Sequence, residues 1–180
     1  MFRYTALVNS FETRNTNTND LSHYCNCIGS SISGTQRETN DSIQAAALSA
    51  IVNITNGSDS NRTLTVELNG LRPILEAISS SQSSESVRRG VMALANISFN
   101  DNFNADKVVS MDGHVIVLLV LQTCDVSQDH QLIGACLVLL ANLCCHESSQ
   151  SILGATEGLC ETVLRTCTST RCSEELLIST

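Results

Sequence analysis

The sequence predicts an all-α protein built from stacked helical repeats. Similar segments recur with a period of 43 to 46 residues, and the apolar residues within them follow the spacing of one helix face. The composition agrees, because 42% of the residues are hydrophobic, only 3% are aromatic, and Pro73 is the sole proline. Leu, Ile, Val and Ala pack helices well, whereas a β-sandwich would usually carry more aromatic and turn residues.

Two landmarks recur in each repeat. The segments SAIVNIT (49–55), MALANIS (92–98) and VLLANLC (138–144) each carry an asparagine, and a glycine follows it after 16 or 17 residues. The asparagines are Asn53, Asn96 and Asn142, and the glycines are Gly70, Gly113 and Gly158. Two landmarks that keep a common offset through three copies argue against coincidence, and this period is typical of two- or three-helix solenoid repeats.

Each repeat is expected to contain three helices. The longest carries the asparagine, and its core stripe falls at i, i+3, i+4, i+7, i+10 and i+11. The three stripes are Gln44 (which interrupts the apolar pattern), Ala47, Leu48, Ile51, Ile54 and Thr55; Val87, Gly90, Val91, Leu94, Ile97 and Ser98; and Ile133, Cys136, Leu137, Leu140, Leu143 and Cys144. After the asparagine, a short helix is expected to end at the glycine in the left-handed conformation, and a second helix follows. Ser- and Asp-rich strings at 79–86, 124–129 and 168–175 then close each unit and supply N-caps for the next long helix.

This order of helices, with a glycine turn and an Ala-Leu-x-Asn-Leu-like string in the long helix, resembles the armadillo repeat over roughly residues 42–170. The resemblance implies a right-handed α-solenoid of three-helix repeats. The expected units are 42–83, 84–127 and 128–170. Residues 1–41, in which Asn9 precedes Asn53 by 44 residues, are expected to form a partial or degenerate repeat with a polar loop, or else a frayed tail. Residues 171–180 would begin a further, truncated repeat, so that the chain is a slice of a longer solenoid.

The resemblance also implies a binding site, because armadillo proteins grip the backbone of an extended peptide with this asparagine in a concave groove lined by the third helices. At about 100° per residue, Asn142 lies about 180° from the start of its core stripe, and Asn53 and Asn96 are equivalent. A primary amide can both donate to and accept from a peptide group. The alternative is that each asparagine only ties down its own loop.

Further groove candidates lie four residues from these asparagines, on the same face. They are Met92 and Val138 upstream and Asn100 and His146 downstream. Arg89, with Arg88 and His146, hints at a basic groove like that of β-catenin-like members, which hold acidic peptides. Importin-α-like members instead hold lysines between indoles, and this chain has no Trp. That departure argues against binding of nuclear localisation signals and leaves the class of target open.

The expected function is a protein–protein interaction scaffold that binds an extended peptide or a helix of another protein in this groove. The alternative is a structural spacer in a larger multidomain protein, such as a ubiquitin-ligase or cytoskeletal assembly. With a net charge of −8 and Lys107 as the only lysine, the chain lacks the basic stripe that nucleic acid or an anionic membrane surface attracts. No phosphate-binding glycine loop, HExxH motif or nucleophile elbow is present, so we expect neither an enzyme nor a cofactor or small-molecule substrate.

The nine cysteines bear on location and on metal binding. Their odd number argues against a complete set of internal disulfides, and no secretory signal is visible in MFRYTALVNSFETR. The expected location is the cytoplasm or nucleus, where thiols stay reduced. His23, Cys25 and Cys27 lack a fourth ligand at a sensible spacing, so no metal is expected. Cys136 and Cys144 lie on the core stripe, where a buried cysteine acts as a small hydrophobe.

Overall fold

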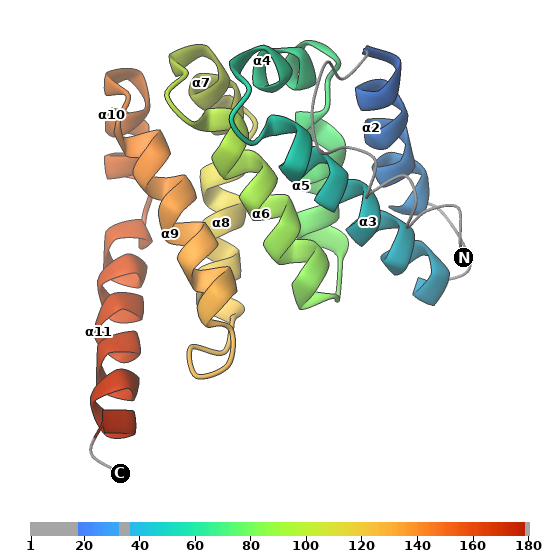
Figure 1. The fold of residues 1–180 in the computed structure, drawn as a ribbon. Coiled ribbons are helices and arrows are strands. Elements are labelled where there is room, and N and C mark those ends of the chain that lie inside the picture. The colour runs from blue at the N-terminus through green and yellow to red at the C-terminus, as the bar shows by residue number, and fades with distance from the viewer. Residues whose placement is uncertain (1–17, 33–36, 179–180) are drawn as a thin grey trace.

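A computed structural model describes residues 18–32 and 37–178 of the chain. Within these ranges every regular element is an α-helix, and there are ten of them. The predicted all-α fold is confirmed. The helices form three layers, and every third helix along the chain returns to the same layer (Figure 1).

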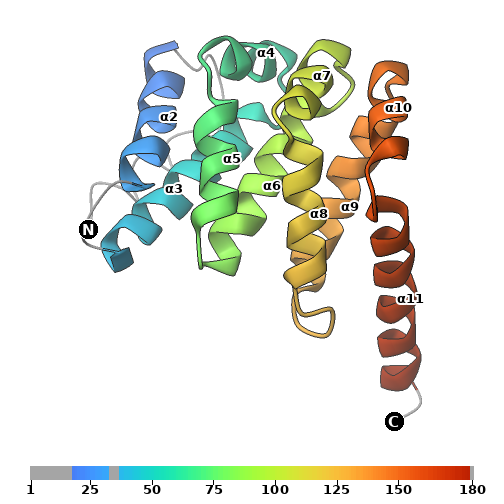
Figure 2. The same ribbon diagram turned by 180° about the vertical axis from the view of Figure 1, so that it is seen from behind.

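The front layer in Figure 1 consists of the three long helices that carry the landmark asparagines, side by side with a common tilt. They are α3 (Arg37–Thr55), α6 (Ser84–Ser98) and α9 (His130–Cys144). The view from behind shows the second layer (Figure 2). It contains α2 (Thr18–Ile32), α5 (Leu71–Ser80), α8 (Gly113–Thr123) and α11 (Leu159–Ile178). Three short helices lie along one edge: α4 (Asp59–Glu67), α7 (Asn102–Ser110) and α10 (Glu147–Ala155).

The hydrophobic core lies between these layers and follows the predicted stripes. On α6, Val91, Leu94 and Ile97 are fully buried, and the stripe of α3 is buried as far as Thr55. The second layer contributes Leu71, Ile74, Leu75 and Ile78 from α5 and Val117, Leu118 and Leu121 from α8. Each helix alone would leave its stripe in water, and burial stabilises the stack by about 25 cal/mol per Å² of apolar surface.

Short polar side chains fix where several helices begin. Ser58 precedes α4 and accepts a hydrogen bond from the backbone N–H of Asn61 at 3.4 Å. Asp101 precedes α7 and accepts one from the backbone N–H of Asn104 at 2.9 Å. Ser83 caps α6 in the same way, as the Ser-rich string predicted. Each cap satisfies a backbone donor that has no partner in the first helical turn.

The landmark glycines adopt the predicted left-handed conformation only in the last repeat. In the first two repeats the left-handed residue is the one before the glycine, Asn69 with φ of 57° and Asp112 with φ of 59°. Gly158 has a φ of 76°. Asn and Asp tolerate this region better than most residues do. The predicted conformation is therefore wrong for Gly70 and Gly113.

Close packing requires glycine at these two positions instead. A Cβ on Gly70 would lie 2.8 Å from both Cys25 Sγ and the Thr65 carbonyl oxygen. A Cβ on Gly113 would lie 2.6 Å from Val108 Cγ1. The missing side chain lets α5 and α8 approach the short helices that precede them.

The C-terminal end departs from the expected pattern. The helix α11 is continuous from Leu159 to Ile178, so the string 168–175 forms helix rather than a closing loop, and the expected boundary at 170/171 falls inside it. The boundary at 41/42 likewise falls inside α3. Cys144, expected in the core, is exposed and lines an apolar hollow together with residues of α10 and α11. Asn9 and the rest of residues 1–17 lie outside the described residues.

Candidate functional site

The outward surface of the front layer, which we call the third-helix face, carries the landmark asparagines. We define it by Asn53 on α3, Met92 and Asn96 on α6, and Val138 and Asn142 on α9. Asn53 and Val138 are exposed, and the other three are half-buried. Neighbouring third helices pack directly against one another, so the sequence repeat places equivalent residues side by side (Figure 1).

The side-chain amides of Asn96 and Asn142 join neighbouring repeats. Asn96 Nδ2 donates to the backbone carbonyl of Val52 at 3.0 Å and lies 3.4 Å from Thr55 Oγ1. Asn142 Nδ2 donates to the backbone carbonyl of Ala95 at 2.8 Å. Each carbonyl belongs to the residue directly before the preceding landmark asparagine, so the two hydrogen bonds are equivalent and repeat along the solenoid.

Other amides tie down the loops, which was the alternative role considered for the landmark asparagines. Asn61, Asn104 and Gln150 donate from their side chains to carbonyls at the ends of α3, α6 and α9, at 2.9, 3.1 and 2.8 Å. Sequence reasoning missed these residues. The signal was present, because positions 61, 104 and 150 each follow a landmark asparagine (53, 96 and 142) by eight residues.

A hollow of about 370 Å³ lies on the third-helix face and is bordered by Asn96 and Asn142. Phe99 and Val138, each 54% exposed, also line it. The guanidinium carbon of Arg62 lies 5.5 Å from the centre of the Phe99 ring, a cation–π contact that orients the ring. The remaining lining residues are Asn56, Gly57 and Ala95. Sequence reasoning named Val138 but missed Phe99, because Phe99 follows the end of α6 and takes no part in its periodicity.

Half of the positive charge expected near the start of α6 is neutralised. Arg88 and Arg89 form ion pairs with Glu85 at 2.7 and 2.5 Å. Burial opposes the ionisation of Glu85, but the hydrogen bonds and charges of both arginines outweigh it and hold the pKa of this carboxyl below its usual value. Arg88 Nη1 also lies 3.2 Å from the sulfur of Met92. Two arginines against one glutamate leave one net positive charge beside the third-helix face.

The structure places the two downstream candidates outside the row of asparagines. Asn100 is exposed, but it follows the end of α6 with a φ of 53°. His146 is only 7% exposed, precedes α10, and its Nε2 has no hydrogen-bond partner among the described residues. A spacing of four residues keeps a common face only inside a helix. Because α6 ends at Ser98 and α9 at Cys144, that spacing does not extend to these positions.

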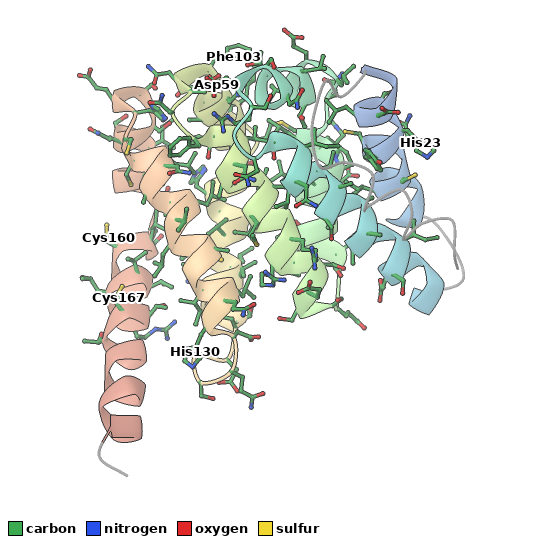
Figure 3. The ribbon with its side chains drawn as sticks, in the orientation of Figure 1. His23, Asp59, Phe103, His130, Cys160 and Cys167 are labelled. Atoms are coloured by element: carbon green, nitrogen blue, oxygen red, sulfur yellow. The ribbon has the colours of Figure 1, made fainter. Side chains whose placement is uncertain are left out.

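The described part of the chain holds neither a metal-type cluster nor a membrane-type helix. Cys27 Sγ lies 3.6 Å from the Nε2 of His23, and His23 projects outward from α2 (Figure 3). Cys25 instead packs into the core, where burial raises the pKa of its thiol to about 11. Within residues 18–32 and 37–178, no three potential metal ligands gather. No helix there is long and apolar enough to cross a membrane.

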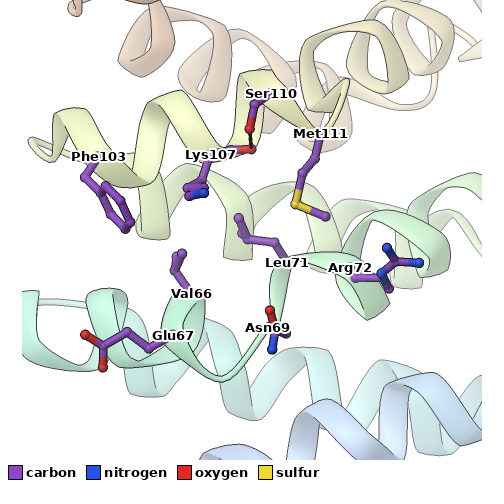
Figure 4. Close-up of a pocket in the computed structure, with 9 residues that line it drawn as sticks. All are labelled: Val66, Glu67, Asn69, Leu71, Arg72, Phe103, Lys107, Ser110 and Met111. Atoms are coloured by element: carbon purple, nitrogen blue, oxygen red, sulfur yellow. Dashed lines mark hydrogen bonds between the residues drawn. The ribbon is translucent and has the colours of Figure 1, made fainter.

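A second hollow, of about 410 Å³, lies at the edge of the molecule between the α4–α5 turn and α7 (Figure 4). Phe103, 57% exposed, stands beside it, and Lys107 Nζ lies 5.6 Å from the centre of its ring. Glu67 and Arg72 bring charges of both signs to the same hollow. It belongs to the row of short helices rather than to the third-helix face, and no sequence signal pointed to it.

No family model and no curated protein matches this sequence, but solved structures match its fold. A designed armadillo repeat protein in complex with peptide (KR)4 matches with a TM-score of 0.55 at 16% identity, over 77% of this chain and 51% of that protein. Two engineered proteins match with TM-scores of 0.57 and 0.55 at 20% and 16% identity, over 79% and 92% of this chain. This chain spans 62% and 70% of their lengths. With its three helical layers and its repeated asparagines, the chain has the armadillo-type repeat fold.

Proposed function

We propose that this chain is a protein-binding scaffold that holds an extended peptide segment of a partner along the third-helix face. The row of equivalent asparagines supports this most, because Asn53 is exposed and Asn96 and Asn142 border a hollow. An extended peptide advances about 3.3 Å per residue, and a row of amides can meet its backbone groups at intervals. The designed armadillo repeat protein that shares this fold is itself in complex with a peptide.

The proposed partner is another protein, met in the cytoplasm or nucleus. Free thiols are found at Cys25, Cys124, Cys136, Cys144, Cys145 and Cys160, as a reducing compartment would keep them. A net charge of −8 disfavours nucleic acid and anionic membranes, which attract basic surfaces. We propose binding rather than catalysis, since the candidate residues are amides and apolar side chains that offer no nucleophile paired with a base.

A display selection tests this function. Random dodecapeptides would be selected on the chain, and fluorescence anisotropy would give the Kd of the enriched peptides. The test variant is Asn96→Ala/Asn142→Ala, and the matched control is Gln82→Ala/Gln128→Ala, which removes two exposed amides from loops outside the face. We expect the test variant to bind at least about tenfold more weakly and the control to bind as the wild type does. Thermal melting of each protein would show that the loss does not come from unfolding, and equal affinities for all three would contradict the proposal.

A structural spacer in a larger assembly is the second candidate. One observation favours it: Asn96 and Asn142 already donate to the neighbouring helices, so their amides have a use without any partner. A spacer would enrich no peptide in the selection. The Asn96→Ala/Asn142→Ala variant would then change only the melting temperature.

A further inference from the structure

The hydrogen bonds between repeats fix which way the landmark amides point. Asn96 Nδ2 lies 3.0 Å from the Val52 carbonyl oxygen, and Asn142 Nδ2 lies 2.8 Å from the Ala95 carbonyl oxygen. A backbone carbonyl can only accept a hydrogen bond, so the nitrogen of each amide must face the neighbouring helix. Oδ1 of each amide is then left to accept from a partner, and the second N–H of Nδ2 remains as a donor, which in Asn96 lies 3.4 Å from Thr55 Oγ1. Both asparagines therefore offer an acceptor, which suits the N–H groups of a peptide backbone.

The hollow between these two asparagines carries no uncompensated charge. Arg62 is the only ionisable residue that lines it. Arg62 is 7% exposed, pairs with Asp59, and donates to the Thr55 carbonyl at 3.4 Å. Its guanidinium also lies beside the Phe99 ring. The charge of Arg62 is thus paired with Asp59, and one of its donors is taken up by the Thr55 carbonyl.

The lining of the hollow selects against charged side chains. A lysine or arginine could donate to Oδ1 of Asn96 or Asn142, but no acidic residue lines the hollow to balance its charge once its water is displaced. A carboxylate would face the acceptor oxygens of Asn96 and Asn142, and Arg62 already has its own partner. Phe99 and Val138 are each 54% exposed. An apolar side chain bound between them would remove their exposed apolar surface from water, which favours binding.

We propose that this hollow receives an uncharged apolar side chain of the extended partner segment, which packs between Phe99 and Val138. Backbone N–H groups on either side of that side chain donate to Oδ1 of Asn96 and of Asn142. The inference rests on the proposed function and adds the class of residue that the partner must carry. The partner is accordingly a neutral, apolar-anchored peptide rather than a basic or an acidic one.

Protein variants with matched controls test the apolar contact. The dodecapeptides enriched on the wild type would be measured against Phe99→Ala and Val138→Ala, each expected to raise the Kd at least about tenfold. Phe103→Ala is the control for Phe99→Ala, because Phe103 is 57% exposed and also has a cation beside its ring, 5.6 Å away. Leu119→Ala, at a residue 55% exposed on α8, is the control for Val138→Ala. Both controls should leave the Kd unchanged, and melting curves would confirm that all four variants fold.

Changes in the peptide test the same contact from the other side. In an enriched peptide, replacing its apolar anchor by Lys or by Glu should each weaken binding at least about tenfold. N-methylation of the two backbone nitrogens that flank the anchor removes the donors to Oδ1 and should also weaken binding. Val138→Asp places a carboxylate in the hollow, and a new selection on this variant should enrich Lys or Arg at the anchor position.

The outcomes separate this inference from the proposed function. Peptides that need Asn96 and Asn142 but carry a charged anchor, or that bind Phe99→Ala and Val138→Ala as tightly as the wild type, would leave the scaffold function standing and overturn the apolar anchor. A selection that enriches no peptide would overturn both. Apolar-anchored peptides that lose affinity on Phe99→Ala and Val138→Ala, but not on Phe103→Ala and Leu119→Ala, support both.

Discussion

The helices α6 and α9 follow the same sequence template but differ in how much of it is buried. On α6, which lies between α3 and α9, Val91 and Ser98 are fully buried. On α9, the residues at the equivalent positions are less covered, because Leu137 is half-buried and Cys144 is exposed. An apolar hollow of about 580 Å³ extends from α9 to α11, where Leu164 is 69% exposed. The sequence period places a residue on the stripe, but the neighbouring repeat decides whether the stripe is buried.

The largest effect on stability should come from replacing the equivalent leucine of each helix by alanine. Leu94 and Leu140 both stand two residues before a landmark asparagine, but Leu94 is fully buried, whereas Leu140 is 5% exposed and lines the apolar hollow. Leu94→Ala should lower the free energy of unfolding by about 2–5 kcal/mol, through lost apolar transfer energy and the cavity left behind. Leu140→Ala should cost less, because part of its surroundings is already open. Urea unfolding would measure both, and equal losses would break the comparison.

The next largest difference in stability should come from replacing a glycine by alanine on each of the two helices. A Cβ on Gly90 of α6 would lie 2.6 Å from Ile78 Cγ1, whereas a Cβ on Gly134 of α9 would meet nothing within 4 Å. Gly90→Ala should destabilise the protein by about 1–3 kcal/mol through overpacking, less the gain in helix propensity. Gly134→Ala should stabilise it by about 0.5–1 kcal/mol, because alanine restricts the unfolded chain and favours the helix. A stabilising Gly90→Ala variant would show that Ile78 moves aside without cost.

Replacing a landmark asparagine by alanine should also cost more stability on α6 than on a helix where the asparagine is exposed. Asn96→Ala removes a hydrogen bond to the Val52 carbonyl and should cost about 1 kcal/mol in unfolding free energy. Asn53 is exposed, so Asn53→Ala should change stability by no more than about 0.5 kcal/mol. Chemical denaturation of both variants would give the difference. A loss for Asn96→Ala as large as that for Leu94→Ala would mark the asparagine as a mainly structural residue and favour the spacer reading.

The sequence predicts features that are set within one helix better than features that depend on how helices pack together. Periodicity acts within one helix, so the stripe of α6 and the three-helix unit could be predicted. The hydrogen bond of Asn142 to Ala95 depends on how two helices pack, which no local pattern contains. Phe99 and His146 lie just beyond helix ends, where a helical spacing no longer orients a side chain. The landmark glycines were found through their recurrence, but the clash that requires Gly70 and Gly113 appears only in three dimensions.

His114 on α8 and Leu159 on α11 both directly follow a landmark glycine, but of the two only His114 can make the stability of the protein depend on pH. His114 is 5% exposed and its Nδ1 has no hydrogen-bond partner among the described residues. Burial, opposed in part by the charge of Asp112, lowers the pKa of His114 below its usual value. The unfolded chain therefore binds the proton more readily, and stability should be full above about pH 6.5 and fall as the pH drops below it. His114→Leu, which places the residue of the last repeat here, should reduce this fall in melting temperature; an unchanged pH profile would assign it to other groups.

The smallest effect on stability should come from Leu164, at the apolar hollow of α11. A side chain that is 69% exposed contributes little to the core, so Leu164→Ser should change the unfolding free energy by no more than about 0.5 kcal/mol. Its effect on association should be larger, because contiguous exposed apolar surface promotes contact between molecules. We expect the wild-type chain to self-associate with rising concentration in sedimentation velocity, and Leu164→Ser to do so less. Leu119→Ser is the control, since Leu119 is 55% exposed but lies outside that hollow. If both variants reduced association equally, exposed leucines in general would be responsible. If only Leu164→Ser reduced association, the apolar hollow between α9 and α11 would be the surface through which the molecules associate. This outcome would agree with the comparison above, in which α9 is less covered than α6.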